Sequence, residues 1–192
     1  MESIAVPKTF SVAFVCSGNR FRSVIAEAVF NTMTSGLPVS VTSYGTLDLG
    51  PVGPLPSALR EAEALGLDIA EHRARTLAGA DLSTTSLVLT FERDHAVAAV
   101  DVAGARLEHV FILPELVLLL GRIRLVQRPD PIEQALENVA RAQAGRHNGA
   151  PPDTIPVIED PIALPEPAQR AIARVVYQAA ESLAVQLFGR RR

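Results

Sequence analysis

The chain has 192 residues, of which 48% are hydrophobic, and a formal net charge of −3 at pH 7. This length fills one core well and is short for two, so we expect a single domain over residues 1–192. The acidic balance, with no basic run except the terminal GRRR, argues against nucleic acid or an anionic membrane as a partner. The longest apolar run, LVLLL, is far shorter than the roughly 18 residues that span a bilayer, and MESIAVPKTF has no basic leader. We therefore expect a cytoplasmic protein.

The number of cysteines limits the kinds of site that the chain can form. The chain has one cysteine, Cys16, which excludes an internal disulfide framework and any cysteine-rich metal site. We expect no metal and no cofactor, and we expect Cys16 to act as a thiol.

Apolar segments alternate with segments of helical period through the first 113 residues. The expected strands are 10–15, 39–44, 86–91 and 109–113, and the expected helices between them are 23–33, 57–65 (closed by Gly66) and 92–100. Nearly continuous apolar strands separated by helices are typical of a parallel sheet covered on both faces. The predicted fold is α/β, a doubly wound four-stranded parallel sheet with helices on both faces.

The last third predicts two further helices. Asp130 is a candidate N-cap followed by Pro131, which favours a helix over about 131–144. Residues 145–154 read as an exposed loop, and a final helix starts near Pro165 and keeps the 3.6-residue period as far as Leu187.

The stretch VAFVCSGNRFRSV, residues 12–24, places Cys16 at the end of a strand and just before a helix. A cysteine there could simply pack as a small hydrophobic residue. A loop between a strand and a helix also directs several backbone N–H groups at one point, and the helix N-terminus adds partial positive charge, which together form an anion site. Such surroundings stabilise a thiolate, so Cys16 is a candidate nucleophile.

The other residues of this loop suit a bound phosphate. Arg22 offers a planar fork that can hold two phosphate oxygens, and Gly18 lets the backbone approach the anion. Asn19 tolerates the left-handed conformation that a tight loop needs, and the Ser23 hydroxyl can donate to the thiolate.

These residues also carry a family resemblance. The segment VCSGNRFRS, with AEA just after it, resembles the phosphate loop of the low-molecular-weight protein tyrosine phosphatases. Four later segments are similar to that family as well: SYGT at 43–46, LDIAEHRARTL at 67–77, TFERDH at 90–95 and VIEDP at 157–161. The resemblance covers nearly the whole chain.

The resemblance implies a two-step hydrolysis of a phosphotyrosine protein or a small aryl phosphate, with a phosphocysteine intermediate. By matching position, Cys16 attacks phosphorus, Arg22 holds the phosphate, and Asp160 protonates the leaving group and then activates water. The substrate-binding residues are Ser17, Gly18, Asn19, Arg20, Phe21 and Ser23. A supporting network that orders the loop matches Asn19, Ser23, Ser43 and His72.

Two choices among similar residues follow. Asp130 and Asp160 both precede proline, and we assign Asp130 to the helix cap and Asp160 to the general acid, because only Asp160 is not followed at once by a helical pattern. For His95, His109 and His147 we expect structural or exposed roles, as is usual for single histidines.

The chain departs from the family pattern at three places. Phe21 stands where a second cysteine is common, and Ile162, Ala163 and Leu164 stand where aromatic residues commonly follow the aspartate. Residues 121–154 look like a helical insertion relative to the shorter family members. Tyrosine specificity is therefore less well supported than phosphatase chemistry.

Two other functions remain open. The first is an arsenate reductase that depends on an external thiol, because the chain has no second cysteine, and the second is a catalytically weak phosphate-binding module. The expected ligand in the loop is a phosphate ion, and the expected assembly is a monomer or weak dimer.

Overall fold

A computed structural model describes residues 9–146 and 155–189. Its centre is a sheet of four parallel strands in the order β2-β1-β3-β4. The strands are β1 (Phe10–Cys16), β2 (Val39–Gly45), β3 (Leu87–Thr90) and β4 (Val110–Ile112). The four predicted strands are confirmed, and their observed ends differ from the predicted ends by one or two residues at most.

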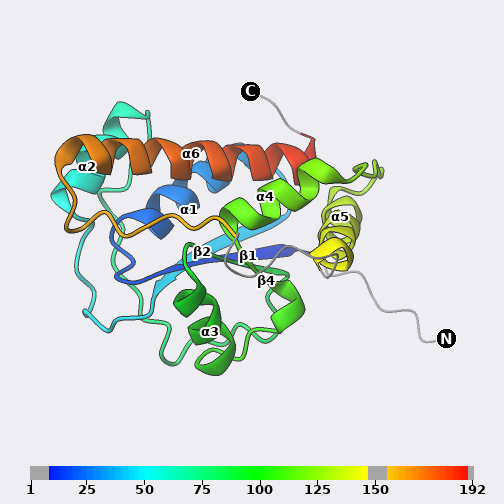
Figure 1. The fold of residues 1–192 in the computed structure, drawn as a ribbon, viewed down its shortest axis with the longest axis horizontal. Coiled ribbons are helices and arrows are strands. Elements are labelled where there is room, and N and C mark those ends of the chain that lie inside the picture. Colours follow the sequence, from blue (N-terminus) through cyan, green and yellow to red (C-terminus); the bar gives the residue numbers. More distant parts are fainter. Residues whose placement is uncertain (1–8, 147–154, 190–192) are drawn as a thin grey trace.

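Helices cover both faces of this sheet, as predicted. They are α1 (Arg22–Met33), α2 (Pro56–Ala64), α3 (Arg93–Asp101), α4 (Leu113–Arg122), α5 (Pro131–Arg146) and α6 (Glu166–Phe188), with a 3-10 turn at Leu107–His109. Figure 1 shows α1, α2, α4 and α6 on one side of the sheet and α3 on the other. The long helix α6 runs across α1 and α4.

The alternation of side chains along β1 divides the core in two. Phe10, Val12, Phe14 and Cys16 face the larger cluster, which α1 and α6 complete. Ala13 and Val15 face the smaller cluster beneath α3. Cys16 therefore comes to the end of β1 on the side from which α1 begins.

Helix α4 has no counterpart among the predicted helices. Its sequence, LPELVLLLGR, is apolar over most positions, so its helical period is hidden. The buried positions are Leu113, Glu115, Leu116 and Leu120, and the Glu115 side chain accepts a hydrogen bond from Ile112 N at 3.1 Å. This contact caps the start of the helix directly after β4.

Some of the predicted features fall outside the described residues. His147, most of the predicted loop at 145–154 and the arginines at 190–192 are among them. Within residues 9–146 and 155–189, no helix combines the length and apolar character that a membrane crossing requires.

Candidate active site

The loop between β1 and α1 begins at Cys16, the last residue of β1, and ends at Arg22, the first residue of α1. Cys16 is 2% exposed, and its Sγ lies 3.0 Å from Ser23 Oγ. The Ser23 hydroxyl can therefore donate to a thiolate at this position. The predicted placement of the cysteine between a strand and a helix is confirmed.

Asn19 holds the loop from its centre. Its φ of 50° makes it left-handed, the conformation predicted for it, and its side chain is fully buried. The amide donates to Ser23 Oγ at 2.9 Å and to Ser43 Oγ at 2.7 Å, while its Oδ1 accepts from Arg75 N at 2.8 Å. The buried amide thus joins the loop to β2 and to the segment before β3.

His72 completes the network predicted around Asn19. Its Nε2 lies 3.0 Å from the Asn19 carbonyl oxygen and 3.2 Å from Asn19 Oδ1. Burial lowers the pKa of His72 below its ordinary value, although the bond to Asn19 and the charge of Glu27 act in the opposite direction. The four predicted members, Asn19, Ser23, Ser43 and His72, are therefore in contact with one another through Asn19.

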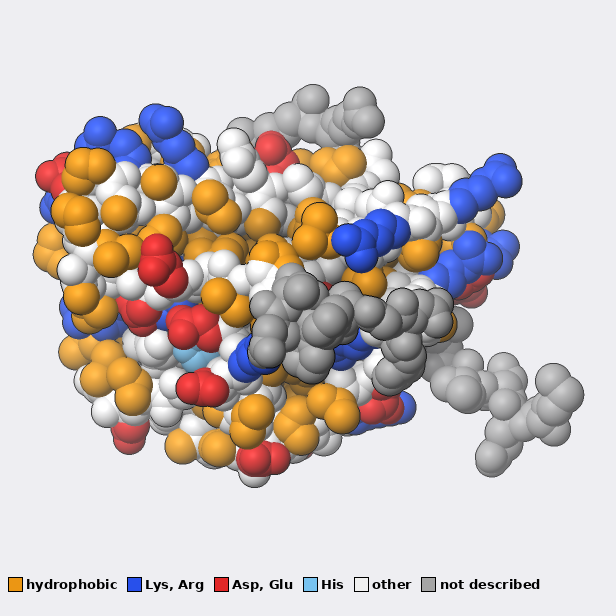
Figure 2. Space-filling view, viewed as in Figure 1, with side chains coloured by type: hydrophobic (Ala, Val, Ile, Leu, Met, Phe, Trp, Pro, Cys, Tyr) orange, Lys and Arg blue, Asp and Glu red, His pale blue; other side chains and the backbone are white. Residues whose placement is uncertain are grey.

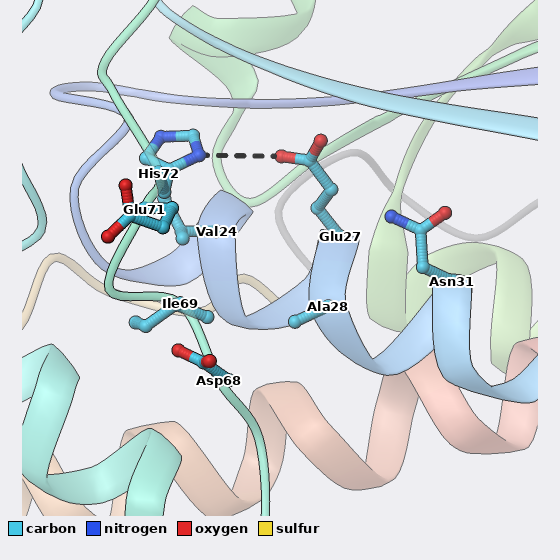
Figure 3. Close-up of a pocket in the computed structure, with 8 residues that line it drawn as sticks. All are labelled: Val24, Glu27, Ala28, Asn31, Asp68, Ile69, Glu71 and His72. Carbon is cyan, nitrogen blue, oxygen red and sulfur yellow. Dashed lines mark ion pairs between the residues drawn. The ribbon is translucent and has the colours of Figure 1, made fainter.

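Glu27 is a part of this network that the sequence did not single out. It lies in α1, and Figure 3 shows its carboxylate directed at the His72 ring, with 3.8 Å between Oε2 and Nδ1. The same carboxylate accepts hydrogen bonds from Ser43 Oγ and from Arg75 Nη2. Its only sequence signal was its place within AEA, just after the loop.

Gly45 lets the end of β2 lie against the loop. A Cβ at this position would come within 2.8 Å of the Ser17 carbonyl oxygen and 3.0 Å of Asn19 N. The register that pairs Cys16 with Gly45 brings the two backbones together here. Only glycine fits this approach without displacing the loop backbone.

Arg22 has one of the most completely buried large side chains, with 1% exposure. One nitrogen, Nη1, donates to Glu92 and to the Ile158 carbonyl oxygen, the latter at 2.8 Å. The other, Nη2, donates to Ser17 Oγ at 3.1 Å and to Asp160 Oδ2 at 2.5 Å. A buried guanidinium needs such compensation, because removal of its charge from water is costly.

Glu92 was also missed by the sequence reasoning. It lies between the end of β3 and α3, where the carboxyl ends of parallel strands form a crevice. It belongs to the TFERDH segment, which resembles the family, but no residue of that segment was predicted to lie in the site.

Asp160 and Asp130 occupy the positions predicted for them. Asp160 lies beside the loop, where its Oδ2 accepts from Arg22 and Ser17, and its Oδ1 accepts from Ile162 N at 3.0 Å. Asp130 Oδ1 accepts from Ile132 N at 2.7 Å and from Glu133 N at 3.4 Å, as an N-cap of α5 does.

His95 is buried, which fits the structural role expected for it, but it also contacts the loop, which the sequence did not indicate. His95 lies in α3, 4% exposed, and its Nε2 is 3.0 Å from Ser17 Oγ. Burial and the nearby charge of Arg22 lower the pKa of His95, which favours the neutral ring. His109 fits the structural role expected for it, because its Nδ1 lies 3.0 Å from the Thr85 carbonyl oxygen.

The side chains of Arg20 and Phe21 are held by contacts of their own. Arg20 Nε donates to the Gly53 carbonyl oxygen at 2.7 Å, and the Phe21 ring packs in the larger core cluster. Phe21 can therefore contribute to an anion site only through its backbone. Gly18 faces the segment after β2, where an added Cβ would lie 3.4 Å from Leu49 Cδ1.

The surface near the loop carries aliphatic and acidic side chains. Leu47, Leu49 and Ile162 are exposed aliphatic residues in the segments that follow β2 and Asp160. Figure 2 shows several acidic side chains grouped around a histidine at the left end of the molecule. A phosphorylated group that approaches the loop from this side meets no aromatic wall in these two segments.

Comparison with known proteins identifies the family. The sequence profile described as "Low molecular weight phosphotyrosine protein phosphatase" matches residues 11–142, well over half of the chain. The chain belongs to this family. The family is named for phosphotyrosine protein phosphatase activity, and the curated relative below carries a matching name. The matched residues include the loop, Ser43, His72, Glu92 and His95, whereas Asp160 lies beyond them.

A curated relative agrees with this assignment. The probable low molecular weight protein-tyrosine-phosphatase EpsP of Ralstonia nicotianae is 34% identical over 82 residues, which cover 43% of this chain and 55% of the relative. The match thus spans about half the length of that relative.

The structural likeness extends over nearly the whole chain. The tyrosine phosphatase Wzb from Escherichia coli in complex with sulphate has a TM-score of 0.66 at 20% identity, covering 93% of this chain and 99% of Wzb. The YwlE arginine phosphatase from Geobacillus stearothermophilus has a TM-score of 0.66 at 21% identity, covering 93% and 92%. At these identities the likeness establishes the fold, and proteins of this fold carry more than one named substrate class.

Proposed function

We propose that this chain is a cysteine-dependent phosphomonoester hydrolase that acts on phosphotyrosine proteins or small aryl phosphates. The observation that carries the proposal is the meeting of three groups at one loop: the Cys16 thiol, the Arg22 guanidinium and the Asp160 carboxylate. The family's name and the sulphate complex of Wzb support a phosphate-like anion as the ligand.

In the first step, Cys16 attacks as the thiolate. The Sγ–P bond forms while the bond from phosphorus to the phenolic oxygen breaks, and Asp160 gives its proton to the departing oxygen. Arg22 and the loop backbone from Ser17 to Arg22 hold the three remaining phosphate oxygens. The Ser23 hydroxyl, 3.0 Å from Sγ, stabilises the thiolate before attack and again as it leaves in the second step.

In the second step, a water molecule attacks phosphorus and Asp160 takes its proton. The Sγ–P bond breaks, the thiolate is restored, and inorganic phosphate leaves. Asp160 therefore gives one proton and accepts one in each cycle, and no external reagent is consumed.

The experiment is turnover of p-nitrophenyl phosphate by the wild-type chain and by Cys16→Ser. The wild type should release nitrophenolate, and the serine variant should show no turnover while it still binds phosphate or vanadate through Arg22 and the backbone. A serine variant with a tenth or more of the wild-type activity would exclude the covalent mechanism. Arsenate reduction with an added thiol, in the absence of phosphatase turnover, would favour the reductase instead.

We also propose a cellular compartment and an oligomeric state for this protein. A thiol nucleophile must stay reduced, which suits the cytoplasm. We propose a monomer or weak dimer, which sedimentation at several protein concentrations tests directly. We also propose that residues 121–154 are an insertion within the single domain.

A further inference from the structure

The Ser17 hydroxyl lies at the centre of three polar groups. Arg22 Nη2 is 3.1 Å from Ser17 Oγ, Asp160 Oδ2 is 3.0 Å from it, and His95 Nε2 is 3.0 Å from it. A hydroxyl has one proton to donate and two lone pairs to accept with. The three contacts are therefore satisfied together only if Ser17 donates to one group and accepts from the other two.

The chemistry of the three groups fixes the direction of each bond. Arg22 can only donate, and Ser17 donates its proton to the carboxylate of Asp160. The remaining contact must then run from His95 to Ser17. His95 therefore carries its proton on Nε2 and donates it to Ser17 Oγ.

The surroundings of His95 agree with a neutral ring that has one N–H. Its Nδ1 is buried and has no hydrogen-bond partner among the described residues. A proton on Nδ1 would leave a buried donor without an acceptor, which is unfavourable. The charged groups that face the ring are Arg22, which disfavours protonation, and Glu92, Asp94 and Asp160, which favour it less strongly than burial opposes it.

In the proposed reaction, the hydrogen bonds of Ser17 and His95 matter most when substrate binds. A phosphate in the loop requires the donors of Arg22, so the direct bond from Arg22 to Asp160 must be given up when substrate binds. The Ser17 hydroxyl then remains as a side-chain donor to Asp160 Oδ2, and His95 keeps its proton directed at Ser17 Oγ.

We propose that His95 is a positioning residue for Asp160 and acts through the Ser17 hydroxyl. This inference rests on the proposed role of Asp160 as general acid and base. His95 itself touches neither the phosphate nor the leaving group. Without its N–H, the Ser17 hydroxyl is free to turn away, and the carboxyl of Asp160 loses its fixed orientation.

The test compares His95→Leu with His95→Gln, because Gln can return an N–H donor near the position of Nε2. Acid catalysis contributes roughly 10²–10⁴-fold, so partial loss of positioning in His95→Leu should lower kcat for phenyl phosphate about tenfold. The loss should be about threefold or less for p-nitrophenyl phosphate, whose leaving group needs little protonation. KM should stay near the wild-type value, and His95→Gln should recover most of the loss.

A double-variant cycle separates positioning from a general structural role. In the Asp160→Asn background, His95→Leu should cause no further loss, because the group that it positions can no longer transfer a proton. An independent, additive loss in that background, or an equal loss with both substrates, would overturn the inference. The matched control is His109→Leu, which removes a histidine bonded to the Thr85 carbonyl and should leave the ratio of the two substrates unchanged.

A measurement that needs no activity completes the test. Nitrogen NMR of the ring should show His95 neutral at pH 7 with its proton on Nε2, and Ser17→Ala should change its signals. A proton on Nδ1 would contradict the inference even if the enzyme is active. If the wild type turns over neither substrate, the proposed function fails. If the wild type is active but His95→Leu gives an additive loss or an equal loss with both substrates, only the inference fails, so the two failures are distinguishable.

Discussion

Arg22 Nη2 lies 2.5 Å from Asp160 Oδ2, so the guanidinium proposed to hold phosphate is paired directly with the proposed general acid. These residues are far apart in the sequence, and the Ile158 backbone joins their segments from two directions. Its N donates to the Phe91 carbonyl at 3.0 Å, and its carbonyl accepts from Arg22 at 2.8 Å. The segment that contains Ile158 and Asp160 is therefore fixed to the end of β3 as well as to the loop.

This pairing makes Asp160 a competitor of bound phosphate. The Asp160→Asn variant should bind inorganic phosphate more tightly than the wild type, because it removes the negative charge that pairs with Arg22. Since Asp160 is 37% exposed, an ion-pair energy of about 1 kcal/mol applies, which corresponds to roughly fivefold in Kd. Calorimetric titration with phosphate measures the Kd of both proteins. Weaker binding by Asp160→Asn would show that Asp160 and phosphate do not compete for Arg22.

The close approach of Gly45 to the loop predicts a second result. The Gly45→Ala substitution places a Cβ within 2.8 Å of the Ser17 carbonyl oxygen, and overpacking of this kind costs about 1–3 kcal/mol. Urea unfolding should show that loss, and turnover should fall because the loop must move. Gly53→Ala is the matched control, because nothing lies within 4 Å of its Cβ position. Equal stability of the two variants would contradict the close approach.

The absence of a second cysteine predicts how the protein responds to peroxide. Oxidation of Cys16 to the sulfenic acid meets no internal thiol that could form a disulfide, so oxidation should proceed to the sulfinic and sulfonic acids. Mass spectrometry of the intact chain after graded peroxide measures the added oxygen atoms. Full recovery of activity without added thiol would contradict this expectation.

The local motifs of the site could be predicted from the sequence, whereas contacts between distant segments could not. Cys16, Asn19 and Arg22 lie in one loop whose flanking strand and helix are evident in the sequence. His95 and Glu92 reach the loop only because β1 and β3 are neighbours in the sheet and end at the same edge. A single histidine in TFERDH gives no indication of that neighbour, so its contact with Ser17 could not be predicted.

The lowered pKa of His72 predicts how the stability of the protein depends on pH. Burial lowers the pKa of His72 below its ordinary value of 6.5 in the folded state. The unfolded chain then binds the proton more readily, so this contribution to stability is complete above pH 6.5 and declines as the pH falls toward the folded pKa. The free energy of unfolding should decline less steeply from pH 7 to pH 5 in His72→Gln than in the wild type. Equal slopes would contradict the shift, because the constant difference between the two proteins would then reflect only the lost bonds to Asn19.

The two Asp-Pro pairs give the sharpest test of the general acid. Asp160 lies beside Arg22 and Ser17, whereas Asp130 Oδ1 accepts hydrogen bonds from two backbone N–H groups at the start of α5. The Asp160→Asn substitution should lower kcat roughly 10²–10⁴-fold, the usual size of acid catalysis, because the amide cannot give up a proton in the same way. The loss should be smaller for p-nitrophenyl phosphate than for phenyl phosphate.

Asp130→Asn is the matched control for this measurement. Asparagine is also a good N-cap, so the substitution should cost at most about 1 kcal/mol of stability, and kcat should stay near the wild-type value. Steady-state kinetics with both substrates and urea unfolding of both variants decide the matter. A large loss of kcat in Asp130→Asn with little loss in Asp160→Asn would move the acid to the segment before α5, and it would leave the Arg22–Asp160 pair with the purely structural role of neutralising a buried guanidinium.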